Sequence, residues 1–227
     1  MSKTVGIIGG MGPAATVELF RRIVAFTPAT RDQEHLRIII DNNPRIPDRT
    51  AAILGKGESP LPLLIETART LEKAGAEVLA LPCNTAHFYL PQLREQVGVP
   101  IVDMVEETVH MVRESMVALL ATDGTAKAGV YQRACTAQGI ELVLPPLREQ
   151  RWLMEIIYKI KAGSAPEGFE DDMGMIIGRL SEQQGVQGVI IGCTELSLIP
   201  IVRSPIAVYD ALDILAHRVV EISRGGK

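Results

Sequence analysis

A chain of 227 residues is long enough to bury a sizeable core, either as one large domain or as two small ones. Its net charge of −4 at pH 7 and its aromatic content of 4% do not favour a nucleic-acid-binding surface. The three cysteines argue against a disulfide framework, and no apolar run is long enough for a signal peptide or a membrane span. We therefore expect a cytoplasmic protein that binds neither nucleic acid nor membranes.

Short apolar runs alternate with amphipathic stretches along the chain. The predicted strands are residues 4–10, 36–41, 77–81, 99–104, 116–122, 140–145, 188–193 and 205–210. The predicted helices cover residues 15–26, 63–75, a stretch from about 105, 124–139, 148–163, 169–185 and 211–223. The strand runs are continuously apolar, which is typical of parallel strands covered by helices on both faces. The Pro-, Gly- and Asn-rich segment 42–62 is expected to be a functional loop or partly helical.

Two of the predicted strands lead into a cysteine. Cys83 follows the run EVLAL and opens the segment CNTAH, while Cys193 ends the run GVIIGC and opens CTELS. At a helix start, oriented N–H donors and the helix dipole lower the pKa of a thiol from about 8.5 toward neutrality. Each cysteine alone is equally well interpreted as a small buried hydrophobe, but the matched positions favour chemistry. Cys135, inside the predicted helix 124–139, is expected to be a core residue.

Topology predicts where a ligand binds. In open parallel sheets, ligands bind beyond the carboxyl ends of the strands, where both cysteines and segments 9–12, 42–49 and 122–125 are expected. The matched cysteines suggest two pseudo-equivalent halves with the site between them. The segment GIIGGMG does not match the dinucleotide fingerprint, so its glycines indicate close approach of a small ligand.

The histidines offer weaker signals. His87 lies four residues after Cys83, so a Cys–His pair is conceivable, although local hydrogen bonding is the favoured interpretation. The histidines are scattered and show no metal-ligand spacing with the cysteines. We therefore expect no metal ion.

Five segments carry a resemblance to a known family. GIIGGMGPAATVELF, NNPRIPDRTAAI, LPCNTAH, ATDGTAKAGVYQ and IIGCTEL occur in order between about residues 5 and 199. Together they resemble the cofactor-independent aspartate/glutamate racemase family, and GGMGP with IPDRT resembles its aspartate racemase branch. The resemblance implies two similar α/β domains with parallel sheets flanked by helices, at 1–102 plus 206–227 and at 103–205, and an active site in the inter-domain cleft. It also implies a homodimer, a small acidic amino acid as substrate, and no pyridoxal phosphate, metal or nucleotide.

The same resemblance assigns roles to individual residues. Cys83 and Cys193 match the two catalytic thiols. Arg49 matches the ligand of the side-chain carboxylate, and Lys161, or else its neighbour Lys159, matches a second cation. The full set of implied substrate-binding residues is Met11, Arg49, Asn84, Thr85, Thr125, Lys161, Thr194 and Glu195, of which Asn84, Thr85 and Thr194 match the positions that hold the α-carboxylate.

The chemistry of racemisation is consistent with two cysteines. One thiolate removes the Cα proton and one thiol on the opposite face returns a proton, with the two roles exchanged for the other enantiomer. The expected function is therefore racemisation of aspartate, with glutamate as a possible second substrate. Two alternatives stay open: another dicarboxylate isomerase or decarboxylase, and a non-catalytic dicarboxylate-binding protein. A decarboxylase needs only one proton donor and a binding protein needs none, so the paired cysteines favour the racemase.

Overall fold

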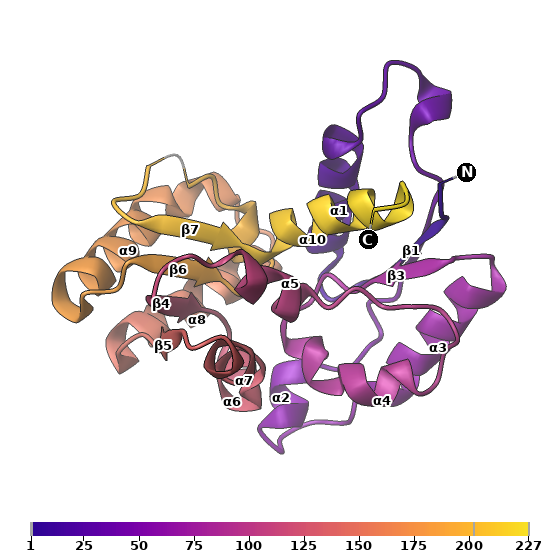
Figure 1. The fold of residues 1–227 in the computed structure, drawn as a ribbon. Coiled ribbons are helices and arrows are strands. Elements are labelled where there is room, and N and C mark those ends of the chain that lie inside the picture. The colour runs from indigo at the N-terminus through magenta and orange to yellow at the C-terminus, as the bar shows by residue number, and fades with distance from the viewer. Residues whose placement is uncertain (1, 202, 227) are drawn as a thin grey trace.

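Two parallel sheets form the framework of the computed structural model, which describes residues 2–201 and 203–226 (Figure 1). The strands of the first sheet, in the order β2-β1-β3, are β1 Val5–Gly9, β2 Ile38–Asn42 and β3 Val78–Ala80. Those of the second, in the order β5-β4-β6-β7, are β4 Met116–Leu120, β5 Glu141–Val143, β6 Gly188–Ile191 and β7 Ala207–Asp210. All of these strand pairs are parallel. The predicted α/β fold is confirmed.

Helices cover both sheets. Those in the first half of the chain are α1 Pro13–Phe26, α2 Arg49–Ile53, α3 Leu61–Lys73, α4 Leu90–Arg94 and the 3₁₀ turns η1 Asp32–Glu34 and η2 Thr85–Tyr89. The later ones are α5 Met104–Met111, α6 Asp123–Ala128, α7 Val130–Ala137, α8 Leu147–Lys161, α9 Glu170–Gln184, α10 Ala211–Ser223 and the 3₁₀ turns η3 Pro166–Phe169 and η4 Leu196–Leu198. The buried residues of α1 and α3 recur at helical spacing, so each helix presents one apolar face to the first sheet.

Two predicted elements differ in the structure. The expected strand over 99–104 makes only a single bridge, between Leu79 and Ile101, because Asp103 already caps α5 by accepting the N–H groups of Val105 and Glu106. The expected helix over 124–139 is interrupted at Gly129, whose φ of 68° lies in the left-handed region that glycine adopts readily. The segment 42–62 is partly helical, since it contains α2.

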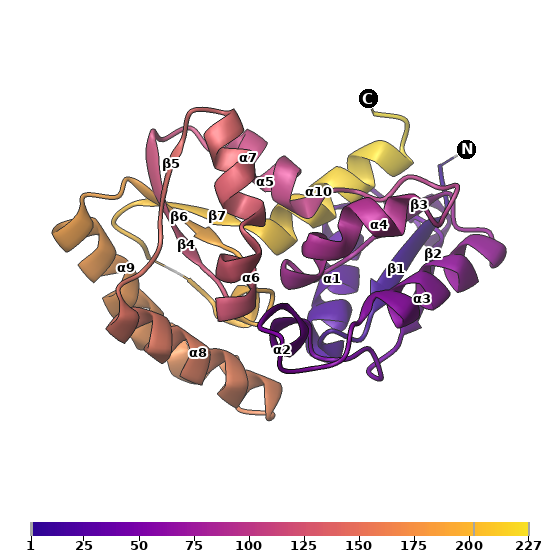
Figure 2. The same ribbon diagram turned by 90° about the horizontal axis from the view of Figure 1, so that it is seen from below.

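The C-terminal segment belongs to both halves. β7 pairs with β6 in the second sheet, whereas α10 packs against α1 and α5 and contributes to the core beneath the first sheet. We call each sheet with the helices that cover it a lobe. Figure 2 shows α10 running from the lobe of the second sheet to that of the first. The sequence analysis assigned residues 206–227 to the first domain. In the structure, β7 of this segment instead pairs within the second sheet. The division of the chain into domains stays a prediction.

A buried arginine ties α1 to the start of α10. The Arg22 side chain is only 8% exposed, and its guanidinium lies 2.7 Å from Asp210 Oδ2 and 2.9 Å from Asp213 Oδ1. It also donates a hydrogen bond to the carbonyl of Ser197, in the segment that follows β6. Asp210 in turn accepts the N–H of Leu212 at the start of α10 and the hydroxyl of Ser197. One guanidinium therefore joins three chain segments.

Replacing this arginine should destabilise the fold. Arg22→Ala leaves the Asp210 carboxylate with little solvent and without its partner, and we expect the free energy of unfolding to fall by about 3 kcal/mol. Arg21→Ala is the matched control, because Arg21 is 65% exposed and pairs with Glu18, a contact worth at most about 1 kcal/mol. Urea unfolding of both variants measures the difference. Equal, small losses would show that the network contributes little.

Candidate active site

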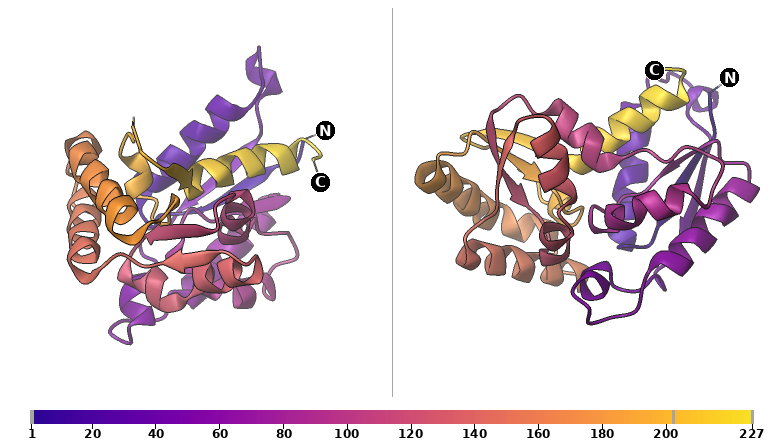
Figure 3. Two further views of the ribbon diagram at one scale, coloured as in Figure 1. Left: turned by 60° about the vertical axis from the view of Figure 1, so that its left-hand side comes forward. Right: turned by 60° about the horizontal axis from the view of Figure 1, so that its bottom comes forward.

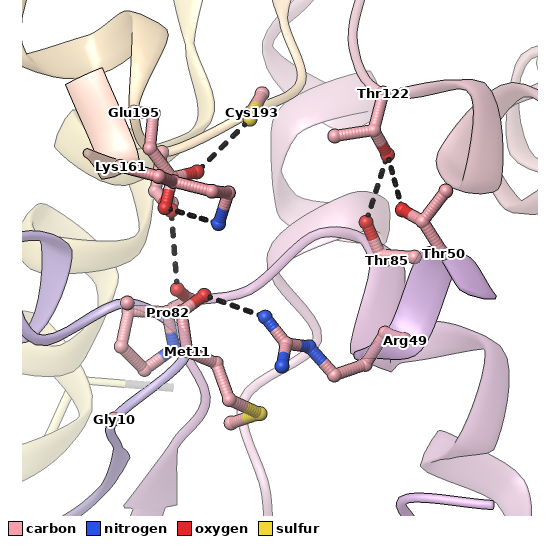
Figure 4. A network of polar contacts seen from close by, with 12 residues as sticks. Gly10, Met11, Arg49, Thr50, Pro82, Thr85, Thr122, Lys161, Cys193 and Glu195 are labelled. Carbon is pink, nitrogen blue, oxygen red and sulfur yellow. Dashed lines mark hydrogen bonds and ion pairs between the residues drawn. The ribbon is translucent and has the colours of Figure 1, made fainter. Parts of the chain in front are cut away.

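The predicted site residues meet in a pocket between the two sheets, beyond the carboxyl ends of their strands. Of the ten residues named from the sequence, all except Thr125 line this pocket, and both Cys83 and Cys193 are among them. Six further lining residues were not predicted as substrate-binding residues, although two of them fall in segments expected at the strand ends: these two are Asp48 and Thr122, and the others are Thr50, Met154, Ile157 and Tyr158. Figure 4 shows Lys161 and Glu195 on one side of the site and Arg49, Thr50 and Thr85 on the other.

Cys193 lies at one end of a chain of polar contacts. Its thiol donates a hydrogen bond to Glu195 Oε2 at 3.1 Å, and Lys161 Nζ lies 2.7 Å from Glu195 Oε1. Burial and the adjacent Glu195 carboxylate raise the pKa of the Cys193 thiol well above its ordinary value. Burial opposes the charge on Lys161, but Glu195 and the cysteines leave the pKa of this amine raised. In this arrangement Cys193 is a protonated thiol and Lys161 is charged.

The expectation of a lowered thiol pKa is therefore wrong for Cys193. That expectation relied on a helix start, whose N–H groups and dipole would stabilise a thiolate. The chain after Cys193 forms only the three-residue 3₁₀ turn η4, so no extended row of aligned peptide dipoles begins there. Burial raises the pKa of the thiol most, and the Glu195 carboxylate, which accepts the thiol proton at 3.1 Å, raises it more than Lys161 lowers it.

The main chain of Cys83 is held by His87. The N–H of Met104 donates to His87 Nε2 at 3.1 Å, so the ring proton lies on Nδ1, which donates to the Cys83 carbonyl at 2.9 Å. Both ring nitrogens are thus bonded to main-chain groups, which agrees with the local interpretation of this histidine. Burial lowers the pKa of His87, so the ring is neutral. His87 fixes the loop that carries Cys83 and does not serve as a base for its thiol.

Two buried donors of the pocket have no partner within the described part of the chain: Asn84 Nδ2 and Arg49 Nε. Tyr131 donates its hydroxyl proton to Asn84 Oδ1 at 2.5 Å, which orients the amide and leaves its NH₂ group unbonded. The terminal nitrogens of Arg49 donate to the carbonyl of Met11 at 3.3 Å (Figure 4) and to that of Pro47 at 3.1 Å. Because an unsatisfied buried donor costs about 1–3 kcal/mol, both groups are suited to bind an oxygen of an anionic ligand.

Four threonine hydroxyls link the two lobes behind these donors. Thr85 Oγ1 lies 2.8 Å from Thr125 Oγ1 and 3.0 Å from Thr122 Oγ1, and Thr50 reaches the same Thr122 hydroxyl at 3.4 Å. Thr122 also caps α6 by accepting the N–H of Thr125 at 3.1 Å. This cap turns the Thr125 side chain beneath Thr85, which explains why Thr125 supports the pocket without lining it.

One face of α8 closes the opposite wall. Met154, Ile157, Tyr158 and Lys161 recur at intervals of three and four residues and all line the pocket. Lys159 is exposed and does not line it, so Lys161 is the lysine that the fold brings to the site. Met154 and Ile157 could have been predicted from the sequence, because they lie seven and four residues before Lys161 and therefore on the same face of the predicted helix.

Within residues 2–201 and 203–226, no group of three His, Cys, Asp or Glu side chains is arranged to hold a metal ion. Over the same ranges, no helix combines the length and the apolar character needed to cross a membrane.

Comparison with known proteins identifies the family. The family model described as "Asp/Glu/Hydantoin racemase" matches residues 8–219, nearly the whole chain. The chain belongs to this racemase family. Among curated relatives, the broad specificity amino-acid racemase RacX of Bacillus subtilis (strain 168) is 25% identical over 230 residues, which cover 95% of this chain and 96% of RacX.

Solved structures of racemases share its fold. The aspartate racemase of Picrophilus torridus superposes with a TM-score of 0.82 at 29% identity, covering 98% of this chain and 94% of that chain. An aspartate racemase homologue from Pyrococcus horikoshii OT3 gives a TM-score of 0.79 at 26% identity, covering 98% and 99%. These likenesses, together with the family match, support an amino-acid racemase function.

The neutral state of His87 predicts a pH dependence of stability. Its pKa is lowered by burial, so below the ordinary value of 6.5 the unfolded chain gains a proton that the folded chain does not take up. Stability should therefore fall as the pH drops below about 6.5, by up to about 1.4 kcal/mol per pH unit from this group. His87→Gln should lose this component of the slope in urea unfolding, whereas His110→Gln, at an exposed position, should keep it. Equal slopes in the two variants would contradict the assignment.

Proposed function

We propose that this racemase interconverts L- and D-aspartate, and accepts glutamate as a second substrate, by a two-base mechanism that uses Cys83 and Cys193 without pyridoxal phosphate. The observation that carries the proposal is that both cysteines, each after the carboxyl end of a buried strand, line one pocket together with Arg49 and Asn84. The printed names of the similar proteins, a broad specificity amino-acid racemase and an aspartate racemase, support the reaction type. The resemblance further supports a cytoplasmic homodimer.

In this mechanism the two thiols act from opposite faces of the substrate Cα. Cys83, as thiolate, removes the Cα proton, and the Cys193 thiol delivers its own proton to the other face. The raised pKa of Cys193 supports its role as the acid in this direction. The reverse reaction begins with Cys193 deprotonated, and the Lys161 cation beside Glu195 then offsets part of the thiolate charge. The roles of base and acid exchange with the enantiomer.

The charged and polar groups of the pocket suit a dicarboxylate. Asn84 Nδ2, with Thr85 and Thr194 as neighbours, would bind the α-carboxylate, on which negative charge develops during proton removal. Lys161 is engaged by Glu195, whereas Arg49 keeps an unbonded Nε, so Arg49 would bind the side-chain carboxylate. Neutral amino acids would leave this guanidinium without an anion.

The thiol mechanism is tested by removing each sulfur. We expect Cys83→Ala and Cys193→Ala each to lower kcat for aspartate racemisation by about 10²–10⁴, because each variant lacks one proton-transfer group. Chiral chromatography measures the product, and Cα hydrogen exchange in deuterated water detects proton removal independently. Cys135→Ala is the matched control, since Cys135 is buried in the core and burial raises the pKa of its thiol to about 11. Full activity of either site variant would refute the two-thiol mechanism, and an absence of exchange in the wild type would favour a binding protein.

The role of Arg49 predicts a loss specific to acidic substrates. Arg49→Ala should weaken transition-state binding of aspartate by about 2–5 kcal/mol, because the side-chain carboxylate then enters the pocket unpaired. This corresponds to a decrease in kcat/KM of roughly thirty-fold to several thousand-fold. Arg49→Lys should recover only part, since lysine cannot bind a carboxylate bidentately.

Arg45→Ala, in the same loop but exposed, is the control and should leave kcat/KM unchanged. Alanine racemisation should fall much less than aspartate racemisation in Arg49→Ala. A decrease by the same factor for both amino acids would show that Arg49 does not recognise the side chain.

A further inference from the structure

The short helix α2, which begins at Arg49, lies against α6 of the other lobe (Figures 2 and 3). Asp48 caps α2 by accepting the N–H of Ala51 at 2.6 Å. The next residue of α2, Thr50, faces the first turn of α6, where Gly124 is buried. This contact is the place where the segment that carries Arg49 meets the second lobe.

Gly124 leaves no space for a side chain. A Cβ atom built on it would lie 2.6 Å from Thr50 Oγ1 and 2.7 Å from Thr50 Cα. The contact with Cα involves the backbone, so a change of the Thr50 rotamer cannot relieve it. The backbone of Gly124 is not in the left-handed region, which means that close packing against α2, and not its own conformation, requires glycine here.

A substituent at this position would displace α2 and leave α6 in place. The start of α6 is anchored by Thr122 and Thr125, whose hydroxyls bond to each other and to Thr85. By contrast, α2 has no buried residue, its Ile53 packs half-buried against the apolar cores, and among the described residues its hydrogen bond to this cluster is the 3.4 Å contact from Thr50 to Thr122. To restore ordinary van der Waals separation from a Cβ, Thr50 has to move by on the order of 1 Å.

We propose that Gly124 is a specificity-determining positioning residue: its bare backbone sets how far Arg49 reaches into the pocket. Gly124 does not line the pocket itself and acts through Thr50, the residue that follows Arg49 in the chain. The proposal rests on the proposed role of Arg49 toward the side-chain carboxylate. With α2 seated directly on Gly124, the guanidinium fits the shorter side chain of aspartate, and displacing α2 outward opens room for the additional methylene of glutamate.

Gly124→Ala tests this inference through the ratio of two substrates. A displacement of about 1 Å at a binding group can cost up to 10²-fold in rate, so kcat/KM for aspartate should fall by about ten- to a hundred-fold. The value for glutamate should fall less or rise, so that the glutamate-to-aspartate ratio increases at least five-fold, a rough lower bound on the same basis. A purely structural defect would lower both values alike.

Gly178→Ala is the matched control, because Gly178 lies within a helix, α9, and a Cβ there meets nothing within 4 Å. The glutamate-to-aspartate ratio of kcat/KM for Gly178→Ala should equal that of the wild type. The double variant Gly124→Ala/Thr50→Gly removes the Cβ and Oγ1 of Thr50, two of the three atoms in conflict, and should return the ratio part of the way. It also serves as the test if the single variant does not fold.

The outcomes separate the two proposals. A wild type that racemises neither amino acid refutes the proposed function, and this inference with it. A wild type that racemises aspartate, combined with an unchanged ratio in both Gly124 variants, refutes the role of Gly124 alone. An equal decrease of kcat/KM for aspartate and glutamate in Gly124→Ala likewise refutes the role of Gly124.

Discussion

Parallel pairing directs the carboxyl ends of β1 and β3 to one edge of the first sheet, and those of β4 and β6 to one edge of the second. The pocket forms where these two edges face each other, so the polar residues that follow the strands converge without any further device. His87, Arg22 and Asp210 fix the segments that follow β3 and β6. The fold thereby brings Cys83 from the first sheet and Cys193 from the second into one pocket.

The two strand ends are fixed in different ways. A neutral histidine ring holds the Cys83 carbonyl by hydrogen bonds, and its burial removes the charge. After Cys193, the segment that contains Ser197 is held instead by the Arg22 guanidinium and the Asp210 carboxylate. The pseudo-equivalence of the halves therefore extends to the strands and the thiols, but not to the interactions that position them. Beside the Cys193 sulfur itself stands the Glu195 carboxylate, which is paired with Lys161.

The sequence predicted those features that depend on local pattern. Continuous apolar runs identified the parallel strands, and the matched cysteines indicated the site, because position along a strand determines position at the sheet edge. Two kinds of feature were missed: the packing of a distant segment, and local side-chain contacts that apolar periodicity does not report. The α8 wall beside Lys161 results from packing across the cleft, and the expected strand over 99–104 was replaced by a helix cap at Asp103. The pKa of the Cys193 thiol is raised by burial and by the Glu195 carboxylate. The expectation based on a helix start considered neither of them.

The course of the chain through β7 and α10 limits how it can be divided. β7 covers one edge of β6 in the second sheet, while α10, directly after it, packs its apolar face with α1 over the first. A fragment that ended before β7 would leave β6 as an open edge, a template for strand pairing between molecules. A fragment with only the first sheet would lose the apolar cover that α10 supplies. The two halves resemble a duplicated unit in outline, yet the first completes its core with a helix that follows the last strand of the second.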